Sequence, residues 1–216
     1  MILLTIFAAA SLTNVFPQID NRQQYSFAGS NQLAAQIRQG APADVFASAN
    51  TALPEQLYKE GLVEKPVVFT RNALTLIVPR SNPAKLHSVY DLRRPGVKLV
   101  MAAKGVPVGD YTRTVLHNLG LDDVQPVSNE SDVREVLAKV ALGEADAGFV
   151  YTTDARTVRG KIATIGIRWS AQPIVKYAVA VVKASAKKTA ARAFVRRLLA
   201  GPGQAKLRAA GFLPLG

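Results

Sequence analysis

The chain has 216 residues, of which 49% are hydrophobic and 19% are charged, so it can bury a large core and disorder is excluded. It contains no cysteine, which excludes disulfides, thiolate metal sites and cysteine nucleophiles. Lysine and arginine outnumber aspartate and glutamate by 27 to 15, and the net charge of +12 raises nucleic acid, an acidic surface or an anionic small ligand as partner.

The distribution of the basic residues argues against nucleic acid. They are scattered along the chain and become dense only over residues 192–208, without a helix-turn-helix, zinc or aromatic RNA-binding signature. We therefore expect a solvated basic surface. No run of about 18 apolar residues occurs, so no membrane-spanning helix is predicted.

The opening stretch, residues 3–14, predicts a strand, a small-residue break and a helix start. Residues 1–10 are apolar but follow no basic segment, so we interpret them as the first buried strand, any export signal having been removed. Three alanines then lead to Ser11, a residue typical of a helix N-cap. The first N–H groups of a helix have no intrahelical partner, so this construction can seat an anion.

The elements expected next alternate between strand and helix. They are a helix over 12–20, a strand over 25–28, a helix over 31–39 after Gly29 and Ser30, a strand over 44–49 and a helix over 50–60 that Gly61 closes.

The second half continues the alternation after a long β run over 71–80. The expected elements are a turn or helix at 91–94, a strand at 98–103, helices at 106–119 and 131–142, strands at 147–150, 161–167 and 175–182, and helices at 187–199 and 204–210.

This order predicts an α/β fold with mixed, mainly parallel sheets. The two longest β runs, 71–80 and 175–182, are the natural crossovers between two lobes. A ligand would then lie in a cleft between lobes, where helix N-termini face each other.

Enzyme signatures are mostly missing. The two histidines, His87 and His117, stand in unrelated settings, and the chain lacks a G-x-S-x-G elbow, H-E-x-x-H, a P-loop and G-x-G-x-x-G. The acidic pairs at 122–123 and at 144 and 146 are typical of solvated loops. We therefore expect no catalysis and no cofactor.

Neutral hydrogen-bond donors remain as the candidate binding groups. The serines, Ser11 and Ser30, follow strands, whereas Val108 and Val133 can offer only backbone N–H groups at helix starts, and Tyr151 can offer a phenolic O–H. Such donors can hold a small dianion without a countercharge, each charge-assisted bond contributing on the order of 1.5–3 kcal/mol. Each residue also has an ordinary interpretation, as an N-cap, a core contact or an amphipathic edge residue.

Several segments resemble the molybdate-binding proteins of bacterial ABC transporters, in order and nearly from end to end. They are AAASLTNVF at 8–16, FAGSNQLAAQIRQGAPADVFASA at 27–49, VPVGDYTRTVL at 106–116, SDVREVLAKVALGEADAGFVYTTDA at 131–155 and GPGQAKLRAAGF at 201–212.

The resemblance implies a type II periplasmic binding fold with two interlobe crossovers. Lobe 1 would hold residues 1–77 plus 178–216 and lobe 2 residues 78–177, with the ligand cleft between them. The implied protein is a periplasmic or otherwise extracytoplasmic monomer that binds molybdate or tungstate and delivers it to an ABC permease.

The ligand contacts that the resemblance implies fall on five residues. They are the hydroxyl and backbone groups of Ser11 and Ser30, the N–H groups of Val108 and Val133, and the hydroxyl of Tyr151. Val108 stands where relatives often have alanine, a change that is harmless if only its N–H is used. Lys104 lies near this segment, and we expect it to face solvent.

Other functions stay open at this point. The same donors suit sulfate, and the same fold serves as the effector-sensing domain of a regulator, although no DNA-binding segment is visible. An enzyme acting on a phosphorylated or sulfated substrate lacks a candidate base near the donors. The basic residues of the helix at 187–199 form either a contact with an acidic permease surface or lipid or, as we expect, a solvated face opposite Ala191, Phe194, Val195 and Leu198.

Overall fold

The structure, a computed structural model, describes residues 2–215 and divides into two compact units. The first unit contains Met1–Asn72 and Val175–Gly216, and the second contains Ala73–Ile174. The chain thus passes between the units twice, once after residue 72 and once after residue 174.

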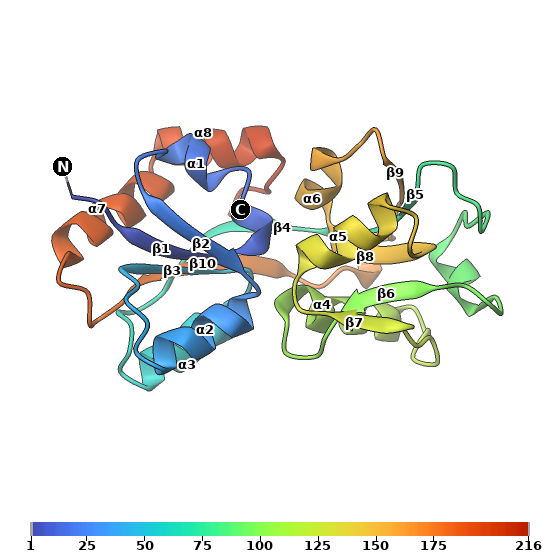
Figure 1. The fold of residues 1–216 in the computed structure, drawn as a ribbon, viewed down its shortest axis with the longest axis horizontal. Coiled ribbons are helices and arrows are strands. Elements are labelled where there is room, and N and C mark those ends of the chain that lie inside the picture. The colour runs from blue at the N-terminus through green and yellow to red at the C-terminus, as the bar shows by residue number, and fades with distance from the viewer. Residues whose placement is uncertain (1, 216) are drawn as a thin grey trace. The chain divides into compact units, whose positions relative to one another are not determined.

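The first unit is built on a five-stranded mixed sheet, drawn mostly in blue and orange in Figure 1. Strand β1 pairs in parallel with β2 and β3, whereas β10 runs antiparallel to β3 and β4. Across the sheet the strands are β2 (Gln24–Ala28), β1 (Thr5–Ala9), β3 (Val45–Ser48), β10 (Val175–Val181) and β4 (Val67–Asn72).

Helices cover both faces of this sheet, as Figure 1 shows. One face carries α2 (Ser30–Arg38) and α3 (Ala52–Lys59). The other carries α1 (Phe16–Ile19), α7 (Lys188–Leu199) and α8 (Gly201–Ala210), and a short 3-10 turn, η1 (Ala10–Leu12), follows β1.

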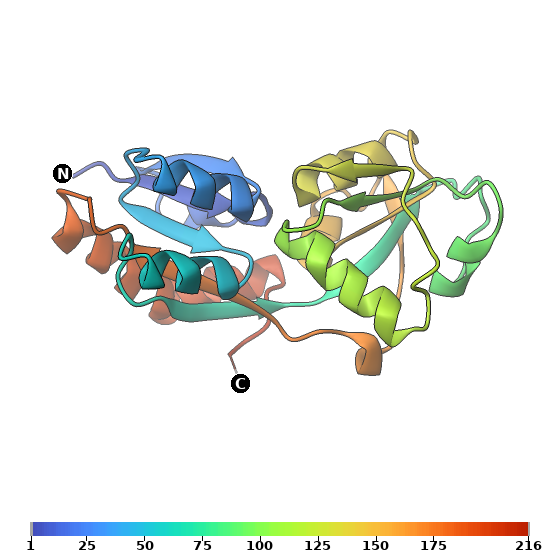
Figure 2. The ribbon, with the colours of Figure 1, turned by 90° about the horizontal axis from the view of Figure 1, so that it is seen from below.

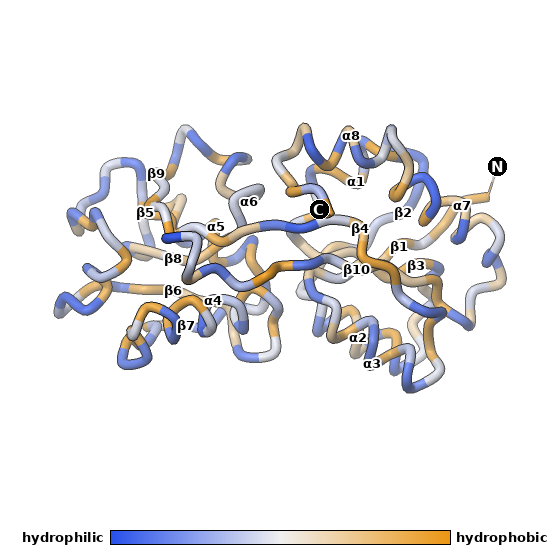
Figure 3. The backbone as a smooth tube through the Cα atoms, turned by 180° about the vertical axis from the view of Figure 1, so that it is seen from behind, coloured by the Kyte–Doolittle hydropathy of each residue, from blue (hydrophilic) through white to orange (hydrophobic). Residues whose placement is uncertain are grey.

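Each face of the first sheet has its own apolar core. Under α2 and α3, Phe7, Phe46 and Leu57 pack in one cluster with Leu33 and Ile37. In Figure 3 these two helices alternate between hydrophobic and hydrophilic colours, as helices with one buried face do.

The opposite face of the first sheet is aromatic. The ring of Phe16 lies 6.1 Å from Tyr25, 6.0 Å from Phe69 and 5.8 Å from Phe194, measured between centroids. These tilted and edge-on arrangements are the favourable ones for aromatic pairs, so the cluster fixes α1 and α7 on the sheet.

The second unit repeats the plan with the strand order β7-β6-β8-β5-β9. Strand β6 pairs in parallel with β7 and β8, whereas β5 is antiparallel to β8 and β9. The strands are β5 (Leu74–Pro79), β6 (Leu99–Ala102), β7 (Ser128–Glu130), β8 (Ala147–Tyr151) and β9 (Ile162–Ile165).

Helices also flank the second sheet. Figure 1 shows α5 (Val133–Ala141) and α6 (Thr152–Thr157) on one face, and Figure 2 shows α4 (Pro107–Asn118), in light green, along the other. Two 3-10 turns, η2 (Val89–Arg93) and η3 (Trp169–Ala171), complete the unit.

The predicted α/β class, with mixed sheets between helical layers, is confirmed. Parallel pairing is confined to strands β1, β2 and β3 in the first sheet and to β6, β7 and β8 in the second. Strands β10 and β5 run antiparallel to their neighbours in the two sheets. The single β run expected over 71–80 is two strands, β4 and β5, separated at Ala73. The break falls where the chain leaves the first unit.

The helix expected over residues 12–20 is wrong in extent. Only Phe16–Ile19 is α-helical, and Ala10–Leu12 forms the 3-10 turn. Pro17 gives the physical reason, since proline is tolerated in the first helical turn but not further in, so a helix containing it must begin close to it.

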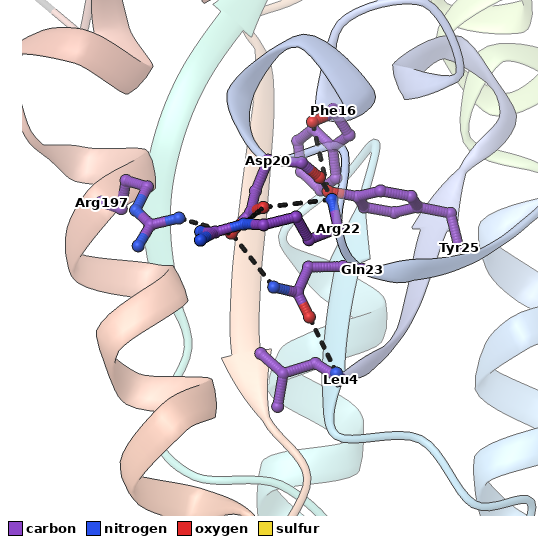
Figure 4. Close-up of polar contacts among 7 residues, drawn as sticks. All are labelled: Leu4, Phe16, Asp20, Arg22, Gln23, Tyr25 and Arg197. Atoms are coloured by element: carbon purple, nitrogen blue, oxygen red, sulfur yellow. Dashed lines mark hydrogen bonds and ion pairs between the residues drawn. The ribbon is translucent and has the colours of Figure 1, made fainter. Parts of the chain in front are cut away.

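Asp20 is the centre of a polar cluster in the first unit, shown in Figure 4. Its buried carboxylate accepts hydrogen bonds from Arg22 Nε at 2.8 Å and Gln23 Nε2 at 3.0 Å, and it also accepts one from Arg197 Nη1 on α7. Hydrogen bonding from the Arg22 guanidinium holds the pKa of Asp20 far below its usual range. The cluster ties the turn before β2 to α7.

The basic face of α7 is exposed to solvent, as expected, and it also forms ion pairs that the sequence did not indicate. Arg197 pairs with Asp20 and Arg192 with Glu64, and Lys187 Nζ, just before the helix, lies 3.2 Å from the carboxylate of Asp44. The apolar side is as predicted, with Ala191, Phe194 and Leu198 buried.

Candidate functional site

The carboxyl ends of the parallel strands in the first unit gather two of the predicted site residues at one sheet edge. Ser11 follows β1, Ser30 follows β2, and Ala49 follows β3, the three strands being paired in parallel. In α/β sheets this edge is where ligands bind.

Neither serine is a helix N-cap, contrary to the sequence prediction. Ser11 lies within η1, and Ser30 is the first residue of α2, whose N-cap is Gly29. The Ser30 hydroxyl instead accepts a hydrogen bond from the Ala49 N–H at 3.1 Å. Ser30 therefore ties the end of β2 to the end of β3.

The Ser11 hydroxyl has a side-chain partner that the sequence did not indicate. Ser11 Oγ lies 2.9 Å from the hydroxyl oxygen of Tyr177 on β10, and Asn72 Nδ2 donates to that same oxygen at 3.4 Å. Donation from Asn72 favours the arrangement in which Tyr177 in turn donates to Ser11. All three side chains are buried.

These bonds orient both serines in the same sense. A hydroxyl has one proton and two lone pairs, so a serine oxygen that accepts from the protein keeps its own proton for another acceptor. Ser30 accepts from Ala49, and Ser11 accepts from Tyr177 in the favoured arrangement. In that arrangement the first unit presents two hydroxyl donors at the carboxyl edge of its sheet.

The second unit gathers the other three predicted residues in the same way. Strands β6, β7 and β8 are parallel, and they lead to the starts of α4, α5 and α6 respectively. Val108 is the second residue of α4, Val133 is the first of α5, and Tyr151 is the last of β8.

Val108 owes its position to its neighbours. Pro107 occupies the first helical turn, where its fixed φ suits the helix, and Gly109 packs so closely on the end of β6 that a Cβ there would overlap the carbonyl oxygens of Ala102 and Ala103. An N–H in the first turn has no intrahelical acceptor. The valine side chain is buried, so the backbone N–H is the group of Val108 that can donate to a ligand.

The start of α5 is already capped by acidic side chains. Asp132 accepts from the N–H groups of Arg134 at 2.6 Å and Glu135 at 3.2 Å, while Glu135 accepts from the Ser131 N–H at 2.8 Å. These bonds use the second and third N–H groups of the helix, whereas the predicted donor is the first, that of Val133.

Tyr151 lies deeper than an amphipathic edge residue. Its side chain is 1% exposed, and its strand pairs with β5 at Leu74, while the next N–H, that of Thr152, donates to Ala73 O at 2.9 Å. The ring is therefore fixed by the sheet.

Asp154, three residues after Tyr151, is a buried acid that sequence reasoning missed. Arg134 Nε on α5 lies 3.1 Å from its carboxylate, and the Arg134 guanidinium also donates to Thr157 Oγ1 at 3.3 Å. Burial raises the pKa of Asp154 to about 7, although the Arg134 charge acts in the opposite direction. The pair joins the first turns of α5 and α6.

The remaining candidates lie outside these edges. Lys104, His87 and His117 are exposed, and His117 Nδ1 lies 3.0 Å from the Asp122 carboxylate. Within residues 2–215 no group of three or more histidine, aspartate or glutamate side chains is arranged to hold a metal ion. In the same range no helix combines the length and apolarity that crossing a bilayer requires.

Two mixed sheets flanked by helices, with the chain passing twice between the units, form the fold of an α/β solute-binding protein. The chain belongs to the bacterial extracellular solute-binding protein family, whose model matches residues 4–213. The predicted resemblance is thereby confirmed at the level of the family.

Individual relatives agree with this membership. The chain is 39% identical over 219 residues to the molybdate-binding protein ModA of Mycobacterium tuberculosis H37Rv, covering 97% of this chain and 84% of that protein. The substrate-binding domain of a putative molybdenum ABC transporter from Clostridium difficile is 31% identical, with a TM-score of 0.73 and full coverage of both chains.

A third relative shares the fold. The periplasmic molybdate-binding protein of Azotobacter vinelandii superposes with a TM-score of 0.86 over 99% of this chain and 100% of its own, at 22% identity. At that identity the likeness concerns the fold alone.

Proposed function

We propose that the protein captures molybdate or tungstate outside the cytoplasm and delivers it to an ABC permease, without catalysing a reaction. In this proposal Ser11 and Ser30 from one unit and Val108, Val133 and Tyr151 from the other converge on a single oxyanion. Lobes of residues 1–77 plus 178–216 and of 78–177 would enclose it, as a monomer.

The observation that carries the proposal is the orientation of the two serines. Ser30 accepts from Ala49, which leaves its hydroxyl proton to donate to an anion, and Ser11 Oγ lies 2.9 Å from the Tyr177 hydroxyl, which leaves the Ser11 proton to donate when Tyr177 is the donor. The ModA protein of M. tuberculosis, 39% identical, is described as molybdate-binding, which supports the choice of ligand.

The donor set also predicts which anions bind weakly. A protonated oxyanion such as hydrogen phosphate carries its own O–H and needs an acceptor, whereas the five groups proposed here donate. The nearby carboxylate of Asp132 already accepts two backbone N–H groups. Fully ionised tetrahedral dianions are therefore favoured.

A thermal-shift screen tests the proposal. Molybdate and tungstate should raise the melting temperature at micromolar concentration, because a ligand that binds only the folded state stabilises it by mass action. Phosphate and chloride at matched ionic strength should not. If neither molybdate nor tungstate shifts the melting temperature, the proposal is wrong.

Sulfate is the second candidate ligand, since it is also a tetrahedral dianion and uses the same kinds of donor. Sulfate is smaller than molybdate, so selectivity between these two ions depends on the dimensions of the closed site. A larger thermal shift with sulfate than with molybdate would favour a sulfate-binding protein.

A further inference from the structure

A second feature with the character of an anion site lies within the second unit, and its lining reaches Thr152, the residue that follows Tyr151. It is a cavity of about 630 Å³ between the end of β5, helix α6 and strand β9. Arg80, Arg156 and Arg159 line it together with Thr164, Ala155 and Ile162.

The three arginines differ from most others in the chain. Arg38, Arg93 and Arg192 donate to carboxylates. Within residues 2–215, by contrast, the guanidinium groups of the three cavity arginines make no hydrogen bond or ion pair with the protein, and no carboxylate is among the cavity's lining residues. The protein leaves their charge unmatched.

The walls that carry these arginines are fixed. Arg80 directly follows β5, and its N–H donates to Lys161 O at 2.9 Å, which joins the β5 end to the start of β9. Arg156 lies in the last turn of α6, and Arg159 follows in the turn that leads to β9. All three arginines are exposed to solvent, so an anion can reach their guanidinium groups.

The chemistry of the lining defines the ligand class. A guanidinium presents a planar fork of donors that matches phosphate oxygens. Three guanidinium groups offer more donors than the two oxygens of one carboxylate can accept from, whereas a phosphate group has more acceptor oxygens. The buried side chains of Ala155 and Ile162 add an apolar wall. A cavity of about 630 Å³ also falls in the range of sites for organic ligands rather than bare ions.

We propose that this cavity binds an organic phosphate monoester, with Arg80, Arg156 and Arg159 holding the phosphate group. The ester is either a free phosphorylated small molecule or the headgroup of a phosphatidic acid, which present the same group. None of the five residues proposed to hold the oxyanion lines this cavity, so the proposal does not depend on the ligand proposed there.

The experiment is calorimetric titration of the whole chain with glycerol 3-phosphate. Molybdate is present at about 1 mM so that the proposed oxyanion site is occupied. The variant is Arg156→Gln/Arg159→Gln, and the matched control is Arg196→Gln/Arg208→Gln, which removes two exposed arginines outside the cavity. We expect one binding event per chain, weakened at least tenfold in the variant and unchanged in the control.

Vesicles distinguish the two sources of the phosphate. Cosedimentation with vesicles of phosphatidylcholine containing phosphatidic acid, but not with phosphatidylcholine alone, together with loss in the same variant, assigns the site to a lipid headgroup. Binding of neither glycerol 3-phosphate nor the vesicles, or equal weakening in variant and control, overturns the proposal. An unchanged melting temperature shows that the variant is folded, whether or not molybdate binds.

Discussion

The hydroxyl oxygens of Ser11 and Tyr177 lie 2.9 Å apart, although the residues are 166 positions apart in the chain. Tyr177 comes from β10, the strand by which the chain returns to the first unit, and Asn72, the last residue before the chain leaves it, donates to the same oxygen at 3.4 Å. The two ends of the passage to the second unit thus orient a predicted ligand-binding hydroxyl.

Tyr177→Phe should weaken molybdate binding although Tyr177 is not proposed to touch the ion. Without the phenol the Ser11 proton loses its orientation, and the loss of one hydrogen bond of roughly 1 kcal/mol corresponds to about a fivefold rise in Kd. Combining it with Ser11→Ala should add little further loss, because both changes remove the same interaction. Strictly additive losses in calorimetry would contradict the coupling.

Gly109→Ala should disturb the second half of the proposed site. The new methyl group would overlap the carbonyl oxygens of Ala102 and Ala103, so the start of α4 has to move and the Val108 N–H moves with it. We expect a lower melting temperature and at least about tenfold weaker molybdate binding, since a charge-assisted bond is worth on the order of 1.5–3 kcal/mol.

The matched control for this change is Gly166→Ala. A Cβ at Gly166 has nothing within 4 Å, and Gly166 is in a loop of the same unit. Equal effects of the two substitutions on affinity would show that the position of α4 is not what binding depends on.

Asp154 gives the second unit a distinct pH dependence. Burial raises the pKa of its carboxyl from an ordinary value of 3.8 to about 7, so between these values the folded state holds a proton that the unfolded state has released. Stability should therefore fall as the pH rises from about 4 to 7, by up to about 4 kcal/mol, and stay level above that.

Asp154→Asn should remove that decline. Denaturant unfolding of the variant and the wild type at pH 4, 5.5 and 7 measures the difference, with the exposed Glu144→Gln as control. A wild type whose stability relative to Asp154→Asn is the same at all three pH values would show that the Arg134 charge keeps Asp154 ionised throughout.

Asp20 should behave in the opposite way at acid pH. Hydrogen bonds from Arg22 lower the pKa of its carboxyl below the ordinary 3.8, so its contribution is present above that value and is lost as the pH falls further. Because the carboxylate is buried and serves two arginines, Asp20→Asn should cost about 2–4 kcal/mol at neutral pH.

Glu60→Gln offers the comparison for Asp20. Glu60 is paired with Arg38, but both side chains are well exposed, so its loss should cost much less stability than the loss of Asp20. Equal losses in urea unfolding of the two variants would mean that the Asp20 cluster is no more important than a surface pair.

Most of the alternation of strands and helices could be predicted from the sequence, because apolar runs and their glycine and serine boundaries are local signals. Gly61, for example, ends α3 with a φ of +78°, as its position indicated. The break at Ala73 could not be predicted, because Arg71–Arg80 reads as one β run and only the tertiary structure divides it.

The sequence indicated which residues to propose for the site, but it did not indicate the residues that support them. Ser11 and Ser30 stand beside recognisable strand ends, whereas their partners Tyr177 and Ala49 come from elsewhere in the chain. A tyrosine within a mostly apolar strand was the one available signal for Tyr177. The signal in the sequence was even weaker for Asp154, because an aspartate in the first turn of a helix is common.

The most direct test of the central claim is calorimetric titration of molybdate into the wild type and into Ser11→Ala/Tyr151→Phe, with Ser81→Ala/Tyr90→Phe, at two exposed positions, as the matched control. The account predicts one ion per chain and an affinity at least about 100-fold lower in the first variant, since each lost donor is worth on the order of 1.5–3 kcal/mol. The control should bind as the wild type does. Unchanged binding in Ser11→Ala/Tyr151→Phe, with its melting temperature preserved, would contradict the account.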